Sequence, residues 1–207
     1  MSDDVRSRIL AEATRRFARA GYAGTSIQEV AAAAGVTRPT LVYHFGSKER
    51  LRSEVLEQLL SHWKDTIPAI LTAATSRGDR FQAALEVLLA FFVEEPDRAR
   101  LLIREMLDRP EEMTERFQTH LQPFTALLTD AIRSGQGAGT YPADLHPEAY
   151  VLHVLTSVLG TIAVGPATGA VMVEAPDLDR RIGELVRIAR TALFTSAALP
   201  GAAASPE

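Results

Sequence analysis

Residues 25–51, TSIQEVAAAAGVTRPTLVYHFGSKERL, contain two short helical patterns separated by a turn. The first pattern places apolar residues at the i, i+3, i+4, i+7 spacing of one buried helix face, namely at Ile27, Val30, Ala31 and Ala34. Two capping boxes are available at its start, Thr25 with Gln28 or Ser26 with Glu29. The sequence therefore predicts a helix that begins next to these hydroxyl residues.

A turn and a second helix follow this first pattern. Gly35 can adopt the positive φ with which many helices end. Thr37 is a suitable N-cap for a helix through His44, and Pro39 is tolerated because the first helical turn needs no N–H donor. Ser47 then caps a third, longer helix. Two short helices around a glycine turn indicate a helix-turn-helix unit, whose second helix enters the major groove of DNA.

The run GYAGTSIQEVAAAAGVTRPTLVYHFGSKERL, residues 21–51, resembles the DNA-binding domain of the TetR family of bacterial transcriptional repressors. The similarity covers about thirty consecutive positions and departs from the family pattern at two. Pro39 stands where glycine is more usual, and Val42 stands where an aromatic residue often contacts phosphate. Val42 removes that phosphate contact and leaves an apolar group that can touch a thymine methyl.

We expect Arg38 to read sequence, because its guanidinium can bind guanine O6 and N7 at once. The chain contains no asparagine, so Gln28 is the only nearby amide for adenine. By resemblance, Thr37, Tyr43, His44 and Lys48 contact phosphate, and Thr25 and Ser26 lie where a helix N-terminus offers backbone N–H groups. The structural alternatives are that Thr37 only caps a helix and that His44 only packs. The predicted DNA contacts are Thr25, Ser26, Gln28, Thr37, Arg38, Pro39, Thr40, Val42, Tyr43, His44 and Lys48.

The charge distribution agrees with a polyanionic partner for the N-terminal end. The net charge is −4, but residues 1–53 hold nine Lys and Arg against five Asp and Glu. Clustered positive charge favours DNA binding through release of counterions. The chain has 207 residues, 46% of them hydrophobic, and no cysteine. We see no signal peptide and no apolar run long enough to span a bilayer, so we expect a cytoplasmic protein.

The rest of the chain shows helical periodicity without strand-like alternation, so the predicted fold is all-α with about nine helices. Beyond the two short helices, the predicted ranges are 3–20, 48–67, 80–94, 96–107, 110–134 with a kink at Pro123, 146–162 and 177–197. A break is expected at 165–169. The predicted domains are a helix-turn-helix domain at 1–47, a helical ligand-binding and dimerisation domain at 48–200, and a disordered tail at 201–207.

The resemblance implies a ligand pocket in the middle helices and a dimer interface in the last two. Pocket candidates are aromatic, methionine or polar residues: Phe91, Phe92, Arg104, Glu105, Met106, Phe117, His120, Phe124, His153 and Thr156. Interface candidates are small or apolar residues: Ser157, Gly160, Thr161, Ile182, Leu185, Val186, Ala189 and Leu193. The alternative for each apolar residue is a place in the protein's own core. The list of aromatic residues favours a hydrophobic or amphipathic effector.

The sequence contains no motif for catalysis, metal binding or a cofactor. His120, His146 and His153 lack metal-ligand spacing, and neither a phosphate-binding loop nor a nucleophile elbow is present. We therefore predict a homodimeric DNA-binding regulator, a repressor that leaves a pseudo-palindromic operator when a small molecule binds. The alternatives are a ligand-independent architectural DNA-binding protein and a helical-bundle enzyme.

Overall fold

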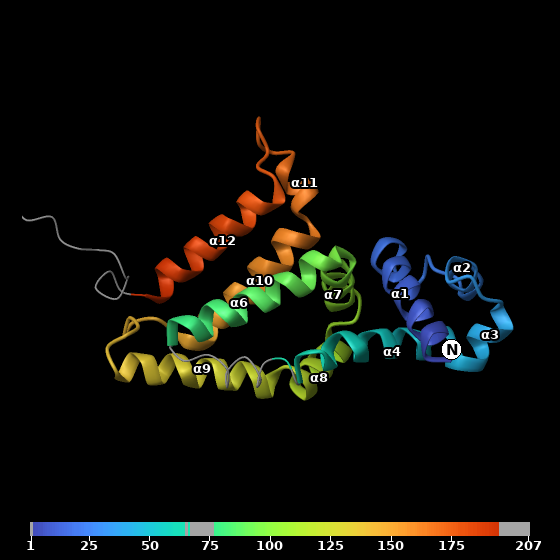
Figure 1. Cartoon of the computed structure of the whole chain (residues 1–207), viewed down its shortest axis with the longest axis horizontal. Coiled ribbons are helices and arrows are strands. Elements are labelled where there is room, and N and C mark those ends of the chain that lie inside the picture. The colour runs from blue at the N-terminus through green and yellow to red at the C-terminus, as the bar shows by residue number, and fades with distance from the viewer. Residues whose placement is uncertain (1, 65, 67–76, 195–207) are drawn as a thin grey trace, which may run out of the picture. The chain divides into compact units, whose positions relative to one another are not determined.

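All regular secondary structure in the described residues is helical, which confirms the predicted all-α class (Figure 1). The structure is a computed structural model that describes residues 2–64, 66 and 77–194. Its helices are α1 (Ser2–Ala20), α2 (Ile27–Ala33), α3 (Arg38–Phe45), α4 (Lys48–Ser61), α6 (Arg77–Glu94), α7 (Pro96–Asp108), α8 (Pro110–His120), α9 (Gln122–Gly137), α10 (Pro147–Ala163), α11 (Gly165–Gly169) and α12 (Leu178–Leu193).

The chain divides into two compact units, each built from two stretches of sequence. Unit 1 comprises Met1–Thr66 and Ala90–Leu121, and unit 2 comprises Ile67–Leu89 and Gln122–Glu207. These units differ from the predicted domains, because α7 and α8 belong to the same unit as the helix-turn-helix segment. The predicted boundary near residue 47 concerns function and stays a prediction.

The helix-turn-helix segment of unit 1 forms through the predicted caps. Ser26 and Glu29 make the capping box at the start of α2, so the alternative box from Thr25 does not form. Thr37 caps α3, with Pro39 in its first turn, and Ser47 caps α4. Gly35 has a φ of 67°, the left-handed conformation that closes α2 before the turn.

Unit 1 also contains α7 and α8, which pack on α1 and α4. The α1–α7 contact carries two ion pairs, Arg15 with Glu95 at 3.0 Å and Arg19 with Asp97 at 3.0 Å. Arg104 of α7 also donates to the backbone carbonyl of Ala18, at the end of α1. The N-terminal helix is therefore attached to α7 by polar as well as apolar contacts.

The described helices of unit 2 are α9, α10, α11, α12 and the first part of α6. Its core contains Ile132, Tyr141, Val151 and Leu193, with Phe81 and Phe194 packed against them. Gly135 of α9 is buried, and a Cβ at this position would overlap the ring of Tyr141. The glycine thus lets the tyrosine ring lie directly against the helix.

Two differences explain why the described residues form eleven helices where about nine were predicted. The pattern at 110–134 divides at Leu121 into α8 and α9, because Pro123 can occupy a first helical turn but not a helix interior. The expected break at 165–169 is instead the short helix α11. Three predicted features lie outside the described residues: the end of the fourth helix, the part of the last helix beyond residue 194, and the tail at 201–207.

Candidate DNA-binding surface and ligand cavity

Helix α3 presents one buried and one exposed face. Leu41 and Phe45 are 0% and 2% exposed, and their i, i+4 spacing directs both into the core of unit 1. Arg38, Pro39, Val42 and Tyr43 are exposed, and Thr40 is half-buried. Thr37 is exposed and accepts a hydrogen bond from the backbone N–H of Thr40. The outward side chains therefore include residues that the sequence analysis assigns to base or methyl contacts, such as Arg38 and Val42, and residues that it assigns to phosphate, Thr37 and Tyr43.

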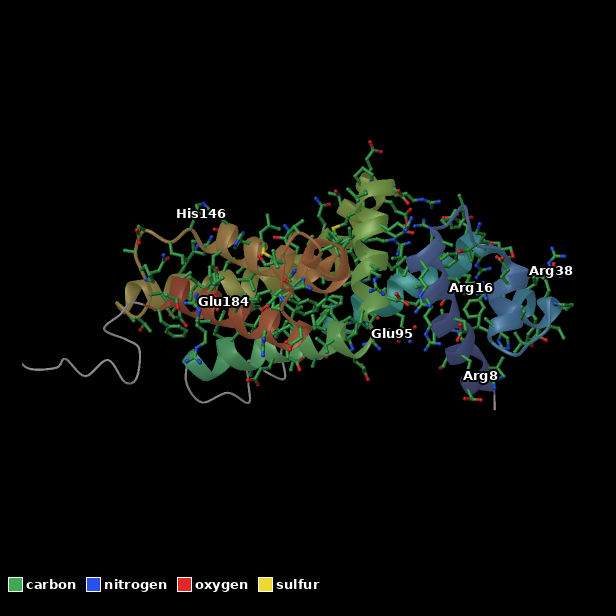
Figure 2. All side chains as sticks on the ribbon, turned by 90° about the horizontal axis from the view of Figure 1, so that it is seen from above. Arg8, Arg16, Arg38, Glu95, His146 and Glu184 are labelled. Carbon is green, nitrogen blue, oxygen red and sulfur yellow. The ribbon has the colours of Figure 1, made fainter. Side chains whose placement is uncertain are left out.

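Arg38 makes no ion pair and no hydrogen bond within the described residues. Figure 2 shows its side chain directed away from the ribbon at the N-terminal end of α3. Two arginines of α1, in contrast, have partners within unit 1: Arg6 pairs with Glu54, and Arg19 pairs with Asp97. The Arg38 guanidinium therefore keeps its donors for an external partner.

The residues predicted to contact phosphate differ in their exposure and in the side chains next to them. Tyr43 is 86% exposed, and the half-buried His44 makes an edge contact with its ring at 5.5 Å. The Lys48 ammonium lies 4.1 Å from the centroid of the Tyr22 ring, a cation–π contact. Lys48 is thus held at the start of α4 with a defined orientation.

The residues before α2 do not offer free groups to phosphate in the way expected. The Thr25 hydroxyl is buried and donates to the carbonyl of Gly21 at 2.8 Å. The backbone N–H of Ser26 donates to the Glu29 carboxylate at 2.9 Å. A hydrogen bond from that backbone, and a second from the Ser26 hydroxyl, lower the pKa of Glu29. An anion of the chain itself, the Glu29 carboxylate, already occupies this N-terminus, and the neighbouring Gln28 side chain is exposed with its amide.

A buried ion cluster fixes the start of α4 within unit 1. Arg52 is 2% exposed and lies 2.5 Å from the carboxylate of Glu105, which is also 2% exposed, and 2.5 Å from that of Glu112. Its third partner is Glu49 at 2.7 Å. Burial alone would raise the pKa of Glu49, but hydrogen bonds from Tyr22 and Arg52 lower it to about 2. The sequence analysis did not identify Arg52, because a single arginine in an amphipathic helix normally faces solvent.

Unit 2 contains an apolar cavity of about 200 Å³. The described residues that line it come from α6, α9, α10, α12 and the segment after α9: Phe81, Ala84, Leu85, Leu88, Leu128, Ala131, Ile132, Ser134, Tyr141, Tyr150, Val151, Val154, Leu155 and Leu193. The Tyr150 hydroxyl donates to the carbonyl of Ala189 at 2.8 Å. This lining is suited to hold a small apolar molecule.

None of the ten predicted pocket residues lines this cavity. Seven belong to unit 1, which is a different unit: Phe91, Phe92, Arg104, Glu105, Met106, Phe117 and His120. Three belong to unit 2 but are not lining residues: Phe124, His153 and Thr156. The search for aromatic and polar residues missed the cavity because most of its lining consists of ordinary leucine, valine, isoleucine and alanine.

Several of the predicted pocket residues have structural partners instead. Phe91 and Phe92 pack with Trp63, with ring centroids 4.8 and 6.1 Å away. Glu105 belongs to the Arg52 cluster, and the ring of His120 lies 3.2 Å from the Glu57 carboxylate. Thr156 donates to backbone carbonyls of its own helix.

The predicted dimer residues are divided between core and surface. Ala189 and Leu193 are 6% and 1% exposed within the single chain, so both lie in its core. The other six are half-buried: Ser157, Gly160, Thr161, Ile182, Leu185 and Val186. At Gly160 the space beside the backbone is open. On the same two helices Leu152 and Ile188 are 62% and 52% exposed, although neither was predicted.

No helix in the described part of the chain is long and apolar enough to cross a membrane. No group of three or more His, Asp or Glu residues there could hold a metal ion.

Comparison with family models matches most of both units. Residues 9–55 match the model described as bacterial regulatory proteins, tetR family, and residues 74–163 match the model described as tetracyclin repressor-like, C-terminal domain. The first match contains the predicted helix-turn-helix, and the second contains most of the helices that form the cavity.

The individual relatives share fewer than a third of the aligned residues with this chain. The HTH-type transcriptional regulator RutR of Escherichia coli K12 is 29% identical over 144 residues, which are 66% of this chain and 66% of RutR. The alignment thus spans just under two-thirds of the length of that relative. The HTH-type transcriptional repressor DhaR of Mycobacterium sp. GP1 is 26% identical over 76% of this chain and 80% of its own.

Solved structures with the same fold are still less similar in sequence. A transcriptional regulator from Saccharomonospora viridis in complex with choline has a TM-score of 0.70 and 20% identity, covering 93% of this chain and 99% of its own. A TetR transcriptional regulator from Chloroflexus aurantiacus also has a TM-score of 0.70, with 19% identity, covering 94% of this chain and 98% of its own.

Proposed function

The chain belongs to the TetR family of bacterial transcriptional regulators, and from this membership we propose how it recognises DNA and what releases it. The family consists of DNA-binding regulators rather than enzymes. The protein is accordingly a helix-turn-helix transcriptional regulator. The contacts, the dimer, the effector and a cytoplasmic location beside the chromosome are our proposals.

The exposed face of α3 reads the major groove. Arg38 carries this assignment, because it is exposed near the N-terminus of a capped helix and has no partner within the described residues. A bidentate contact with guanine contributes about 1–3 kcal/mol of discrimination against other bases. Pro39, Thr40 and Val42 add apolar or methyl contacts, and Gln28 of α2 offers an amide to a neighbouring base or phosphate.

Phosphate contacts position this helix without reading sequence. Tyr43 and Lys48 flank the exposed face of α3, and His44 and Thr37 lie on the same short segment. Lys48 approaches DNA in the orientation set by Tyr22. Thr25 and Ser26 act indirectly, because their hydrogen bonds shape the start of α2 rather than meeting phosphate.

A symmetric dimer brings two α3 helices to the two half-sites of a pseudo-palindrome. We place the dimer interface on α10 and α12, whose exposed faces carry Leu152 and Ile188. The half-buried candidates on these helices, among them Ser157 and Gly160, lie beside this surface or allow close approach. Ala189 and Leu193 support it from the core.

A small effector that occupies the cavity of unit 2 releases the regulator from its operator, so the protein acts as a repressor. The cavity of unit 2 supports this proposal. Release requires that the effector bind the DNA-free conformation more tightly than the DNA-bound one. The alternative, an architectural protein without ligand response, predicts that no cavity ligand changes DNA affinity.

The test begins with selection of bound sequences from random DNA by the purified full chain. We expect a pseudo-palindrome whose half-site spacing reports the dimer. Arg38→Ala should weaken binding to the selected site and relax preference at one base position. Lys48→Ala should weaken all sequences alike and reduce the salt slope by about 1.

Lys64→Ala, at an exposed position after α4 and outside the proposed DNA and dimer surfaces, is the matched control and should leave both properties unchanged. Identical sequence profiles and equal losses for Arg38→Ala and Lys48→Ala would contradict the assigned roles.

A further inference from the structure

We propose that the cavity of unit 2 selects small uncharged molecules, of about the size of a bicyclic aromatic, and excludes organic cations and anions. This inference rests on the proposed ligand response, which leaves the chemical class of the effector open. It concerns selectivity by charge and size, and it follows from which side chains do and do not line the cavity.

The lining supplies apolar contact almost everywhere. Eleven of the fourteen described lining residues are alanine, leucine, isoleucine, valine or phenylalanine. The remaining three, Ser134, Tyr141 and Tyr150, have neutral hydroxyls. No charged or ionisable imidazole side chain occurs among these fourteen residues. A bound ion would therefore find no described side chain of opposite charge in the cavity.

Charged side chains on the same helices line a different depression. Asp130 and Arg133 of α9 and Glu148 of α10 line a groove together with Gln122, Thr125 and Thr129. Arg133 forms ion pairs with both Asp130 and Glu148, so each of these three charged groups has a partner of opposite sign. Val151 and Leu155 line both the groove and the cavity. The α9–α10 pair thus separates its ionic groups from the space that a ligand would fill.

The environment of Tyr150 shows that this region disfavours a charged group. Burial raises the pKa of its phenol above the ordinary value, which means that the ionised form is disfavoured there. Its hydroxyl hydrogen is used by the Ala189 carbonyl, so it does not neutralise a bound anion. A cation would meet only hydroxyl oxygens and aromatic faces, without a carboxylate among the lining residues.

The volume limits the size of the ligand. A cavity of about 150 Å³ lined by aliphatic and aromatic side chains accommodates benzene. The present cavity, at about 200 Å³, accommodates one further fused ring or an equivalent aliphatic group. The carboxylate of a fatty acid finds no side chain of opposite charge among the described lining residues.

The experiment compares three probes that share one ring system and differ in charge: 1-naphthalenemethanol, 1-naphthoate and 1-naphthalenemethylammonium. Binding to the full-length protein without DNA is measured by isothermal titration calorimetry at pH 7. An unpaired ion in an apolar site weakens binding by roughly 100-fold or more, so we expect the alcohol alone to bind measurably. Equal or tighter binding of either ion in the cavity overturns the inference, and so does failure of all three to bind.

Two substitutions locate the binding site. Ala84→Phe adds a ring to the cavity wall and should abolish binding of the alcohol. Ala149→Phe makes the same change at an exposed position outside the lining and should have no effect. Circular dichroism checks the fold of each variant. If Ala84→Phe does not fold, Val154→Phe fills the same cavity from α10. Undiminished binding to a folded cavity variant contradicts the assigned location.

A DNA-release assay distinguishes this inference from the proposed function. If the alcohol binds in the cavity but leaves operator affinity unchanged, the charge selectivity stands and ligand-triggered release fails for this probe. If an ion releases the operator by binding in the cavity, release stands and the selectivity fails. The two proposals can therefore be rejected separately.

Discussion

The interiors of the two units differ in what they bury and in how fully they are packed. Unit 1 buries the Arg52 guanidinium against the Glu105 carboxylate, each 2% exposed, and packs small alanines of α1 and α7 at 0% exposure. Unit 2 has an apolar interior with a cavity of about 200 Å³. A buried ion pair specifies one geometry because its partners cannot separate without leaving charges unpaired. An apolar cavity leaves lining contacts unmade, and a ligand can supply them. Unit 1, which contains the helix-turn-helix, is therefore held in one geometry by buried charge, whereas unit 2 leaves apolar space unfilled.

Removing the centre of the ion cluster should have the largest effect on this contrast. Arg52→Ala leaves the Glu105 carboxylate buried without its partner, and loss of one member of a buried pair costs about 3–5 kcal/mol. Urea unfolding followed by Trp63 fluorescence measures it, because the single tryptophan is buried in unit 1. Arg50→Ala, two residues away at an exposed position, is the control. If both variants lose the same stability, the cluster is not what holds unit 1.

The same substitution placed in each unit tests packing directly. Ala99→Leu adds three carbons to a position that is 0% exposed in unit 1, and overpacking of this kind costs about 1–3 kcal/mol. Ala84→Leu adds them beside the cavity, where they should be neutral or stabilising. Urea unfolding measures the first, and hydrogen exchange of α10 amides measures the second. Comparable destabilisation by both would remove the distinction between a filled and a hollow interior.

Sequence reasoning succeeded where local chemistry determines structure. The hydroxyl caps at Thr37 and Ser47 and the capping box at Ser26 each depend on a few neighbouring residues, so they are visible in the sequence. The apolar spacing of Leu41 and Phe45 likewise fixed which face of α3 is exposed. The DNA-contact set remains a prediction, and the buried hydroxyl of Thr25 is the clearest departure within it.

Sequence reasoning failed where distant segments decide the environment. Arg52 meets Glu105 and Glu112, 53 and 60 residues away, and no local pattern pairs them. The cavity combines α6 with α9, α10 and α12, and leucines that line a cavity cannot be told from leucines that fill a core. Phe91, Phe92 and His120 were predicted from their side-chain type alone, and they lie in unit 1, outside the lining of this cavity.

Acid should weaken unit 1 through the same ion cluster, with the smallest of these effects. The pKa of Glu49 is lowered to about 2, from a model-peptide value of 4.5, against the opposing effect of burial. A carboxylate with a depressed folded pKa stabilises the fold above its unfolded pKa, and this contribution is lost as the pH falls from about 4.5 through 2. Because the Glu49 side chain is 54% exposed, solvent screening limits the contribution to under about 1 kcal/mol.

Glu49→Gln should therefore be less stable than the wild type at pH 6 and equal to it near pH 2, in urea unfolding followed by Trp63. Glu115→Gln, at an exposed position of α8, should show no such convergence. A Glu49→Gln deficit that stays constant across this range would mean that the side chain acts by shape rather than by charge.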